Sequence, residues 1–209
     1  MKPTGESVAA AAVQAVGVGY TYDEMDCQAF VEHCVKQAGG EMAYSGSNDM
    51  ARNAVWLGTL QNAKAAGKLV PGAGMLIHED TEANLPAKYR GDGLGDFSHV
   101  GLYVGENALT DTDKNGQKRS CNVVHSSSSM GRVAGSTLKN GWTHVMWFPE
   151  IDYGVDVQPG VEIGAEISQD TTADSNGAEG GLTAGTPAAS AGRYATVVSP
   201  DGNPVKLRK

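Results

Sequence analysis

The order of periodic segments along the sequence predicts an α+β domain built on an antiparallel sheet. Before Pro71-Gly72, apolar residues recur at helical spacing; after it, they alternate with polar residues as they do in strands. Parallel βαβ units would instead alternate the two types, so the segregation favours helices packed against an antiparallel sheet. The predicted helices are 7–16, 27–38 and 50–66, and the predicted strands are 74–78, 98–105, 122–126 and 143–148.

The second predicted helix carries Cys27 in its first turn. Apolar or small residues repeat along one face of this helix, and Gly39-Gly40 ends it. Asp26 is a preferred N-cap residue, so Cys27 is expected where free N–H groups and the helix dipole favour an anion. A lowered pKa would then favour the thiolate, which is the nucleophilic form. The alternative is a cysteine that serves only as a small buried apolar side chain.

The third predicted helix, 50–66, has helically spaced apolar residues and ends at Gly67. Between the first two predicted strands, the segment 79–97 is polar and contains Pro86 and three glycines. We therefore expect a long loop there.

Two histidines lie where predicted strands meet loops. In 98–105, a period of two puts the apolar side chains on one face and His99 with Gly101 on the other, where the glycine leaves space. His125 follows two valines and precedes four serines. One of these histidines could act as the base for Cys27, and the second could fix the orientation of the first imidazole.

The other histidines are given structural interpretations. His33 is expected on a solvated helix face, His78 at an ordinary strand end, and His144 as a hydrogen-bonded core residue. A metal site could combine Cys27 and Cys34 only if both reached one ion. Seven residues of helix separate the two thiols by about 10.5 Å along the axis, too far to share a zinc ion or a disulfide. No metal and no other cofactor is expected.

Composition limits the class of protein and its partners. A net charge of −8 without a basic patch argues against a nucleic-acid partner, and no apolar run is long enough for membrane insertion. No signal peptide is recognised at the start. Charge also suggests the domain plan: 1–151 carries both signs, 152–192 is an acidic linker rich in Gly, Ala, Ser and Thr, and 193–209 is basic.

Three sequence blocks resemble, in order, the motifs of the NlpC-type cell-wall cysteine peptidases. They are Asp26-Cys27 opening a helix, the segment 98–105, and Val123-Val124-His125-Ser126-Ser127. In that family a cysteine attacks a peptide carbonyl, a first histidine is the base, and a third polar residue orients it. The resemblance therefore implies that Cys27, His99 and His125 are catalytic. It also implies a papain-like fold, with the nucleophile at a helix N-terminus packed on the sheet.

Four further residues are implicated in the substrate and oxyanion region. Tyr20 looks like the family's tyrosine near the nucleophile, while Asp26, Gln28 and Ser98 flank the catalytic positions. The usual Ser-Gly after the cysteine is Gln28-Ala29 here, and the usual paired glycines before it are absent. These departures bear on the shape of the substrate pocket.

The resemblance implies a peptidoglycan hydrolase that cleaves the stem peptide, at the γ-D-glutamyl–diamino acid bond. The alternatives are an N-acetylmuramoyl-L-alanine amidase or a transpeptidase on the same thiol scaffold, and a non-catalytic metal or binding module. We expect a monomer that acts on the cell wall, as a phage lysin, a virion-associated enzyme or a fragment of a larger secreted protein. Residues 193–209 resemble the opening hairpin of a bacterial SH3-like wall-binding module, with a turn at Asp201-Gly202 and too few residues to complete it.

Overall fold

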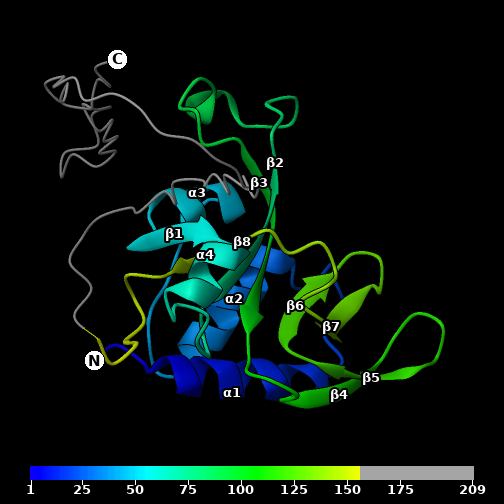
Figure 1. Cartoon of the computed structure of the whole chain (residues 1–209). Helices are drawn as coiled ribbons and strands as arrows, with labels where there is room; N and C mark the ends of the chain where they lie inside the picture. Colours follow the sequence, from blue (N-terminus) through cyan, green and yellow to red (C-terminus); the bar gives the residue numbers. More distant parts are fainter. Residues whose placement is uncertain (156–209) are drawn as a thin grey trace, which may run out of the picture. The chain divides into compact units, whose positions relative to one another are not determined.

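The computed structural model describes residues 1–155 of the protein (Figure 1). The predictions for the linker beyond Val155 and for 193–209 lie outside the described residues. The helices are α1 (Gly5–Val16), α2 (Cys27–Gln37), α3 (Ser47–Arg52), α4 (Leu60–Ala65) and the 3₁₀ turn η1 (Ala87–Tyr89). The strands are β1 (Trp56–Thr59), β2 (Gly74–Glu79), β3 (Asp96–Tyr103), β4 (Leu109–Thr112), β5 (Lys118–Cys121), β6 (Val123–Ser127), β7 (Arg132–Ser136) and β8 (His144–Trp147).

Six strands form the main sheet, in the order β1-β8-β2-β3-β6-β7, and each neighbouring pair is antiparallel. β4 and β5 form a separate hairpin. The prediction of an α+β domain with an antiparallel sheet is therefore confirmed. The central strand β3 pairs with β2 along most of its length, but it pairs with β6 only at Leu102↔Val124 and Tyr103↔Val123. Consequently, β3 and β6 separate near His99.

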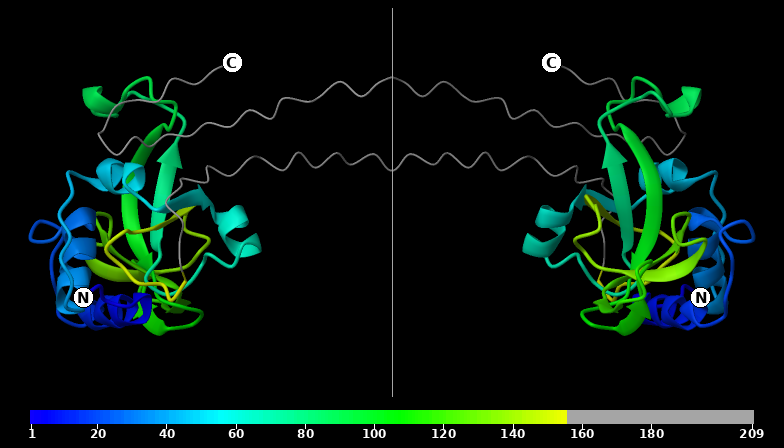
Figure 2. Two further views of the ribbon diagram at one scale, coloured as in Figure 1. Left: turned by 90° about the vertical axis from the view of Figure 1, so that its left-hand side faces the viewer. Right: turned by 90° about the vertical axis from the view of Figure 1, so that its right-hand side faces the viewer.

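The sheet buries side chains on both faces. Helices α1 to α3 cover one face and α4 covers part of the other, as both views of Figure 2 show. Because successive side chains of a strand point to opposite faces, neighbours belong to different cores. Val124 packs on the α1–α3 side, whereas Val123 packs with α4 and all three tryptophans. Each fully buried aliphatic side chain contributes about 1.5–3 kcal/mol, so both faces stabilise the position of β3.

The prediction of one helix over 50–66 is wrong. The structure contains α3, then β1, then α4 in this region. β1 pairs with β8 and buries Trp56 and Leu57 in the two different cores, which a continuous helix cannot do. Thr59 then caps α4, its side chain accepting a hydrogen bond from the Asn62 N–H. The strands β4, β5 and β7 were also not predicted.

The loop between β2 and β3 matches the prediction, with η1 inside it. Asn48 of α3 holds the end of this loop: its Nδ2 donates to Asp96 Oδ1 at 2.7 Å, and its Oδ1 accepts from Phe97 N at 2.9 Å. Ser47 Oγ donates to the Phe97 carbonyl at 2.6 Å. Because all three contacts are buried, they fix the first residues of β3, just before His99.

The described domain continues past the predicted boundary at residue 151. Tyr153 stacks on Trp147, and its hydroxyl donates to the Gly72 carbonyl and accepts from Phe148 N, both at 3.2 Å. Asp152 pairs with Thr4 through an isolated bridge. Among residues 1–155, no helix combines the length and the apolar character needed to cross a membrane.

Candidate active site

Cys27 is the first residue of α2, as the sequence predicts. Asp26 is the N-cap, and its Oδ1 accepts a hydrogen bond from Ala29 N at 2.8 Å. The backbone N–H groups of Cys27 and Gln28 point toward the thiol. Cys27 is a half-buried free thiol, whereas Cys34 and Cys121 are free but buried. Of the three cysteine residues, Cys27 is therefore the most exposed.

The segment before α2 is attached to β6 and β7. The Ser126 hydroxyl, next to His125, donates to the Met25 carbonyl in a buried hydrogen bond. Tyr22 N donates to the Gly131 carbonyl at 3.0 Å, and Val133 N donates to the Tyr20 carbonyl at 3.2 Å. These bonds hold the start of α2 against the strand that carries His125.

The Cys27 thiol also lies beside β3. The Val100 N–H, one residue after His99, is close enough to the sulfur to favour its ionised form. It comes from the part of β3 where the pairing with β6 has ended. The helix start, β3 and β6 therefore meet around Cys27.

The predicted lowering of the Cys27 pKa is wrong. Burial raises the pKa of this thiol above its ordinary value and outweighs the N–H groups of Val100, Gln28 and Cys27, which act to lower it. The Asp26 carboxylate adds to the increase. The position of Cys27 at the helix N-terminus favours the thiolate, but the loss of hydration on burial disfavours the thiolate more strongly. The thiol is therefore neutral at pH 7.

His99 and His125 form a direct hydrogen bond between His99 Nε2 and His125 Nδ1, 2.7 Å apart. Their rings are nearly perpendicular, with centroids 5.0 Å apart. Two neutral tautomers satisfy this bond. If Nε2 of His99 is the donor, its Nδ1 carries a free lone pair, and this nitrogen makes no hydrogen bond to any residue in 1–155. His99 can then accept a proton while His125 stabilises the charged ring.

Trp142, which no sequence pattern indicated as a site residue, packs against both rings. Its indole stacks on His99 at a centroid distance of 5.6 Å and an angle of 26°, and it meets His125 edge to face at 5.3 Å. The indole N–H donates to Ser136 Oγ at 3.2 Å. Gly101 makes this packing possible, because a Cβ there would lie 3.0 Å from both His125 Cβ and Trp142 Cη2.

Burial also controls the charge of the two imidazoles. It lowers the pKa of His99 to about 4. It lowers the pKa of His125 to about 3, with a smaller contribution from the neighbouring His99. Both rings are therefore neutral at pH 7, and within residues 1–155 no hydrogen bond joins the Cys27 thiol to His99. The resting site contains a neutral thiol and a neutral base.

His99, His125 and Trp142 line an open cavity of about 540 Å³. Tyr22 also lines it, and Cys27 and Asp26 raise the pKa of the Tyr22 hydroxyl after the larger effect of its burial. The Cys27 thiol is therefore close enough to this cavity-lining residue to act on its charge state. Cys27 itself is not among the residues that line the cavity.

The four other predicted site residues have different positions. Ser98 lies on the cavity rim, with its hydroxyl donating to Glu79 Oε1 at 3.1 Å. Tyr20 packs edge to face on His33 at 5.2 Å and does not line the cavity, whereas Tyr22 does. The Asp26 carboxylate is the helix cap. The Gln28 side chain donates to Glu32 and to the Tyr44 carbonyl, so only its backbone N–H faces the thiol.

The remaining histidines have structural partners. His33 is half-buried against Tyr20 instead of fully solvated. His78 Nε2 lies 2.9 Å from the Leu94 carbonyl. His144 Nδ1 lies 3.1 Å from Thr143 Oγ1, so His144 is hydrogen-bonded as expected, but it is half-buried and not a core residue.

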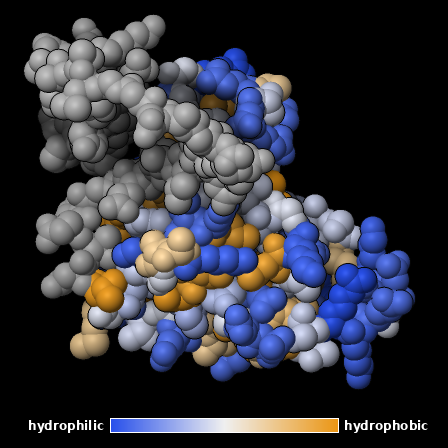
Figure 3. All heavy atoms as spheres, viewed as in Figure 1, coloured by the Kyte–Doolittle hydropathy of each residue, from blue (hydrophilic) through white to orange (hydrophobic). Residues whose placement is uncertain are grey.

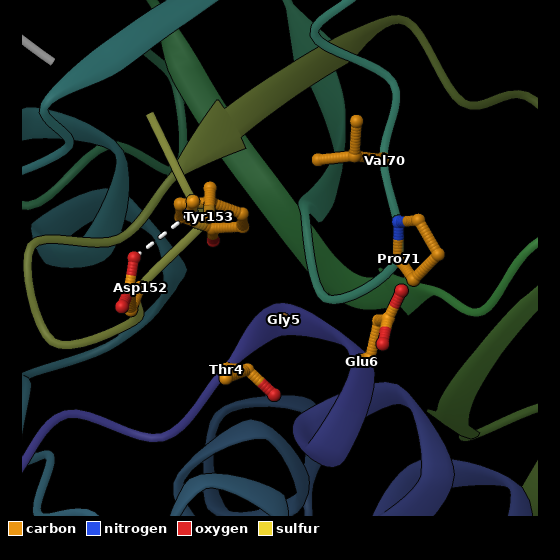
Figure 4. Close-up of a pocket in the computed structure, with 8 residues that line it drawn as sticks. Thr4, Gly5, Glu6, Val70, Pro71, Asp152 and Tyr153 are labelled. Carbon is orange, nitrogen blue, oxygen red and sulfur yellow. Dashed lines mark hydrogen bonds between the residues drawn. The ribbon is translucent and has the colours of Figure 1, made fainter. Parts of the chain in front are cut away.

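A second cavity of about 360 Å³ lies beside the start of α1 (Figure 4). It is lined by Thr4, Gly5, Glu6, Val70, Pro71, Asp152, Tyr153 and Gly154. No cysteine or histidine is among these residues, and the Tyr153 hydroxyl is already hydrogen-bonded on the protein side. This cavity therefore offers no nucleophile and base, unlike the cavity at His99.

Comparisons of the chain with models of known protein families, with curated proteins and with solved structures found no match. The function is therefore inferred from the site itself.

Proposed function

We propose that the protein is a cysteine peptidase of the NlpC type, with a papain-like fold, that hydrolyses the stem peptide of peptidoglycan. The observation that carries this proposal is the 2.7 Å bond between His99 Nε2 and His125 Nδ1, beside a cysteine at a helix N-terminus. This combination supplies a nucleophile, a base with a free nitrogen, and a group that orients the base.

In this mechanism, His99 Nδ1 removes the thiol proton as the Cys27 sulfur bonds to the substrate carbonyl carbon. The negative charge moves to the carbonyl oxygen, where the N–H groups of Cys27 and Gln28 can stabilise it. When the tetrahedral intermediate collapses, the C–N bond breaks and His99 returns the proton to the leaving amine. The product is a thioester between Cys27 and the acyl part of the stem peptide.

In the hydrolysis of this thioester, water is the nucleophile and the Cys27 sulfur is the leaving group. His99 removes a proton from a water molecule as the water oxygen attacks the thioester carbonyl. The C–S bond breaks, the thiolate regains the proton, and the free acid leaves. In both steps His99 carries the positive charge, and acceptance of its Nε2–H by His125 Nδ1 stabilises that charge.

The assignment of peptidoglycan rests on the sequence blocks around the three catalytic positions. The proposal includes action on the cell wall as a monomer, without a metal or other cofactor. An amidase or a transpeptidase would use the same thiol chemistry, but would leave different products. The bond that we propose is the γ-D-glutamyl–diamino acid bond.

The test is digestion of purified cell walls, with the fragments identified by mass spectrometry. The wild type should release fragments cut within the stem peptide, and Cys27→Ala should release none. Cys34→Ala is the matched control, because Cys34 lies on the same helix but is buried in the core. Its activity per folded molecule, with folding checked by a melting curve, should resemble the wild type. Turnover by Cys27→Ala would refute the proposal, and free muramoyl ends with an intact stem would indicate the amidase.

A further inference from the structure

The cavity at the histidine pair has a second wall, formed by the β4–β5 hairpin. The hairpin contributes Asp113, Lys114, Asn115 and Arg119 to the lining. None of these residues belongs to the proposed catalytic machinery. Figure 3 shows strongly hydrophilic residues where Figure 1 places the β4–β5 turn. This wall is thus polar, whereas the wall at Trp142 is aromatic.

The charges on this wall do not cancel. Arg119 forms an ion pair with Asp113, which leaves the Lys114 ammonium group without a carboxylate within 4 Å in residues 1–155. With His99 and His125 neutral, two cations and one carboxylate give the cavity lining a net charge of +1. The whole chain has a net charge of −8. A positive cavity in an acidic protein favours an anionic ligand group.

The hairpin is held in place before any ligand binds. Asp113 Oδ1 accepts from Asn115 N at 2.8 Å and from Gln117 N at 3.0 Å, which fixes the turn that carries Lys114. At its base, Asp111 accepts from both Arg132 Nη groups at 3.1 Å and from Gly135 N at 2.8 Å. Both Arg132 and Gly135 belong to β7, so the hairpin is attached to the main sheet. The backbone of the turn that carries Lys114 therefore needs little ordering when a ligand binds.

Neutral hydrogen-bond donors line the same cavity as the cations. Ser128 and Ser129 line the cavity from the β6–β7 turn, and Asn140 lines it from the loop before β8. The side-chain oxygen Oδ1 of Asn140 already accepts from Thr137 Oγ1 at 2.7 Å, which leaves the side-chain N–H groups of Asn140 for a ligand. Hydroxyl and amide donors next to a cation match the oxygens of a carboxylate.

We propose that Lys114 and Arg119 bind a carboxylate of the substrate peptide, so that the enzyme distinguishes free acids from their amides. This inference rests on the proposed function, because it places the carboxylate on the same peptide whose bond Cys27 attacks. The carboxyl concerned is the α carboxyl of the γ-linked glutamyl residue, which lies next to the bond that we propose is cut. Amidation of that carboxyl removes the charge and should reduce recognition.

The experiment compares two synthetic stem peptides that differ only in a free or an amidated α carboxyl on the γ-linked glutamyl residue. Wild-type protein should cleave the free acid with a kcat/KM about tenfold higher, the value of one charged hydrogen bond. Lys114→Gln should lower kcat/KM for the free acid about tenfold and leave the amide nearly unchanged. Lys114→Glu should reverse the preference, because it places a negative charge against the carboxylate.

Lys118 provides the matched control. It is an exposed lysine of the same hairpin that does not line the cavity. Lys118→Gln and Lys118→Glu should leave the preference as in the wild type. Equal effects at Lys114 and Lys118, or equal cleavage of both peptides by the wild type, would overturn the inference and leave the peptidase proposal standing. Failure to cut either peptide or any cell wall would overturn the peptidase proposal itself, and this inference with it.

Discussion

The sheet carries two histidine pairs that look alike but are built differently. His99 and His125 lie on β3 and β6, and their ring centroids are 5.0 Å apart. His78 and His144 lie on β2 and β8, with centroids 4.8 Å apart. In the first pair one nitrogen bonds directly to the other ring. In the second pair each ring bonds elsewhere, His78 to the Leu94 carbonyl and His144 to Thr143.

The two histidine pairs resemble each other in their packing, and His99 and His144 in their pKa values, although the hydrogen bonds of the two pairs differ. Both pairs have an aromatic neighbour, Trp142 for the first and Phe97 for the second. Burial lowers the pKa of His144 to about 4, which is also the value for His99. A shifted pKa therefore does not identify the functional pair. The proposed assignment rests instead on His99 Nδ1, which makes no hydrogen bond within residues 1–155, on the bond to His125 and on the nearby cysteine.

The largest difference is expected on removal of the base. His99→Asn should lower kcat at least 10³-fold on purified wall peptides, because it removes both the acceptor of the thiol proton and the donor to the leaving amine. His144→Asn is the control from the other pair and should keep kcat within about threefold of the wild type. An active His99→Asn variant, or a dead but folded His144→Asn variant, would reverse the assignment of the two pairs.

Replacement of the orienting ring should have a smaller effect. His125→Asn keeps an oxygen that can accept the His99 Nε2–H, so about 1–10% of kcat should remain. His125→Ala offers no acceptor and should lose about tenfold more. Initial rates for both variants, with melting curves to confirm folding, measure the difference. If the two variants had equal activity, the His99–His125 bond would have no catalytic role.

Acid stability should depend on both pairs. In the unfolded chain the imidazoles take up protons near pH 6.5, but the folded protein keeps His99 and His144 neutral down to about pH 4 and His125 down to about pH 3. Between these values the unfolded state binds more protons, so the free energy of unfolding falls as pH falls.

Each buried imidazole contributes a slope of on the order of 1 kcal/mol per pH unit. His144→Gln and His125→Gln should reduce the slope by similar amounts, as measured by urea unfolding at pH 7, 6 and 5. Unequal changes would show that the two pairs differ in burial as well as in bonding. A wild-type stability that is flat between pH 7 and 5 would contradict the lowered pKa values.

The smallest effect is expected at the aromatic neighbour of the first pair. Trp142→Phe keeps a ring against His99 but removes the N–H that donates to Ser136. We expect kcat to fall about threefold, the value of one neutral hydrogen bond. The matched change at the second pair, Phe97→Leu, should affect stability but not kcat per folded molecule. A loss above a hundredfold for Trp142→Phe would mean that the indole acts on the substrate directly.

The sequence predicts those elements whose local apolar period and end signals match the secondary structure that they adopt in the folded domain. α2 has an N-cap, an apolar face and a glycine stop, and it forms as expected. The segment 50–66 has a helical pattern too, but pairing with β8 and burial of Trp56 on the far face outweigh local propensity. The β4–β5 hairpin has few apolar residues, so no period signals it.

At the site, order along the chain indicated Cys27, His99 and His125, and the structure brings their strands and helix together. The order of residues along the chain does not indicate Trp142 or Tyr22 as site residues, because only the folding of the chain brings them to the cavity. The charge state of Cys27 depends on burial, which no local pattern reports. The signal that was available for Trp142 was Gly101, whose missing side chain leaves room for the indole.

The uneven placement of the tryptophans determines what fluorescence can report. All three of them, Trp56, Trp142 and Trp147, lie on the α4 side of the sheet, and none packs with α1 to α3. Tryptophan emission therefore follows one layer of the domain, whereas far-ultraviolet circular dichroism is dominated by the helices, most of which lie in the other. If the circular dichroism signal were lost before the tryptophan emission changed, the helical layer that holds Cys27 would separate from the sheet before the sheet itself melts.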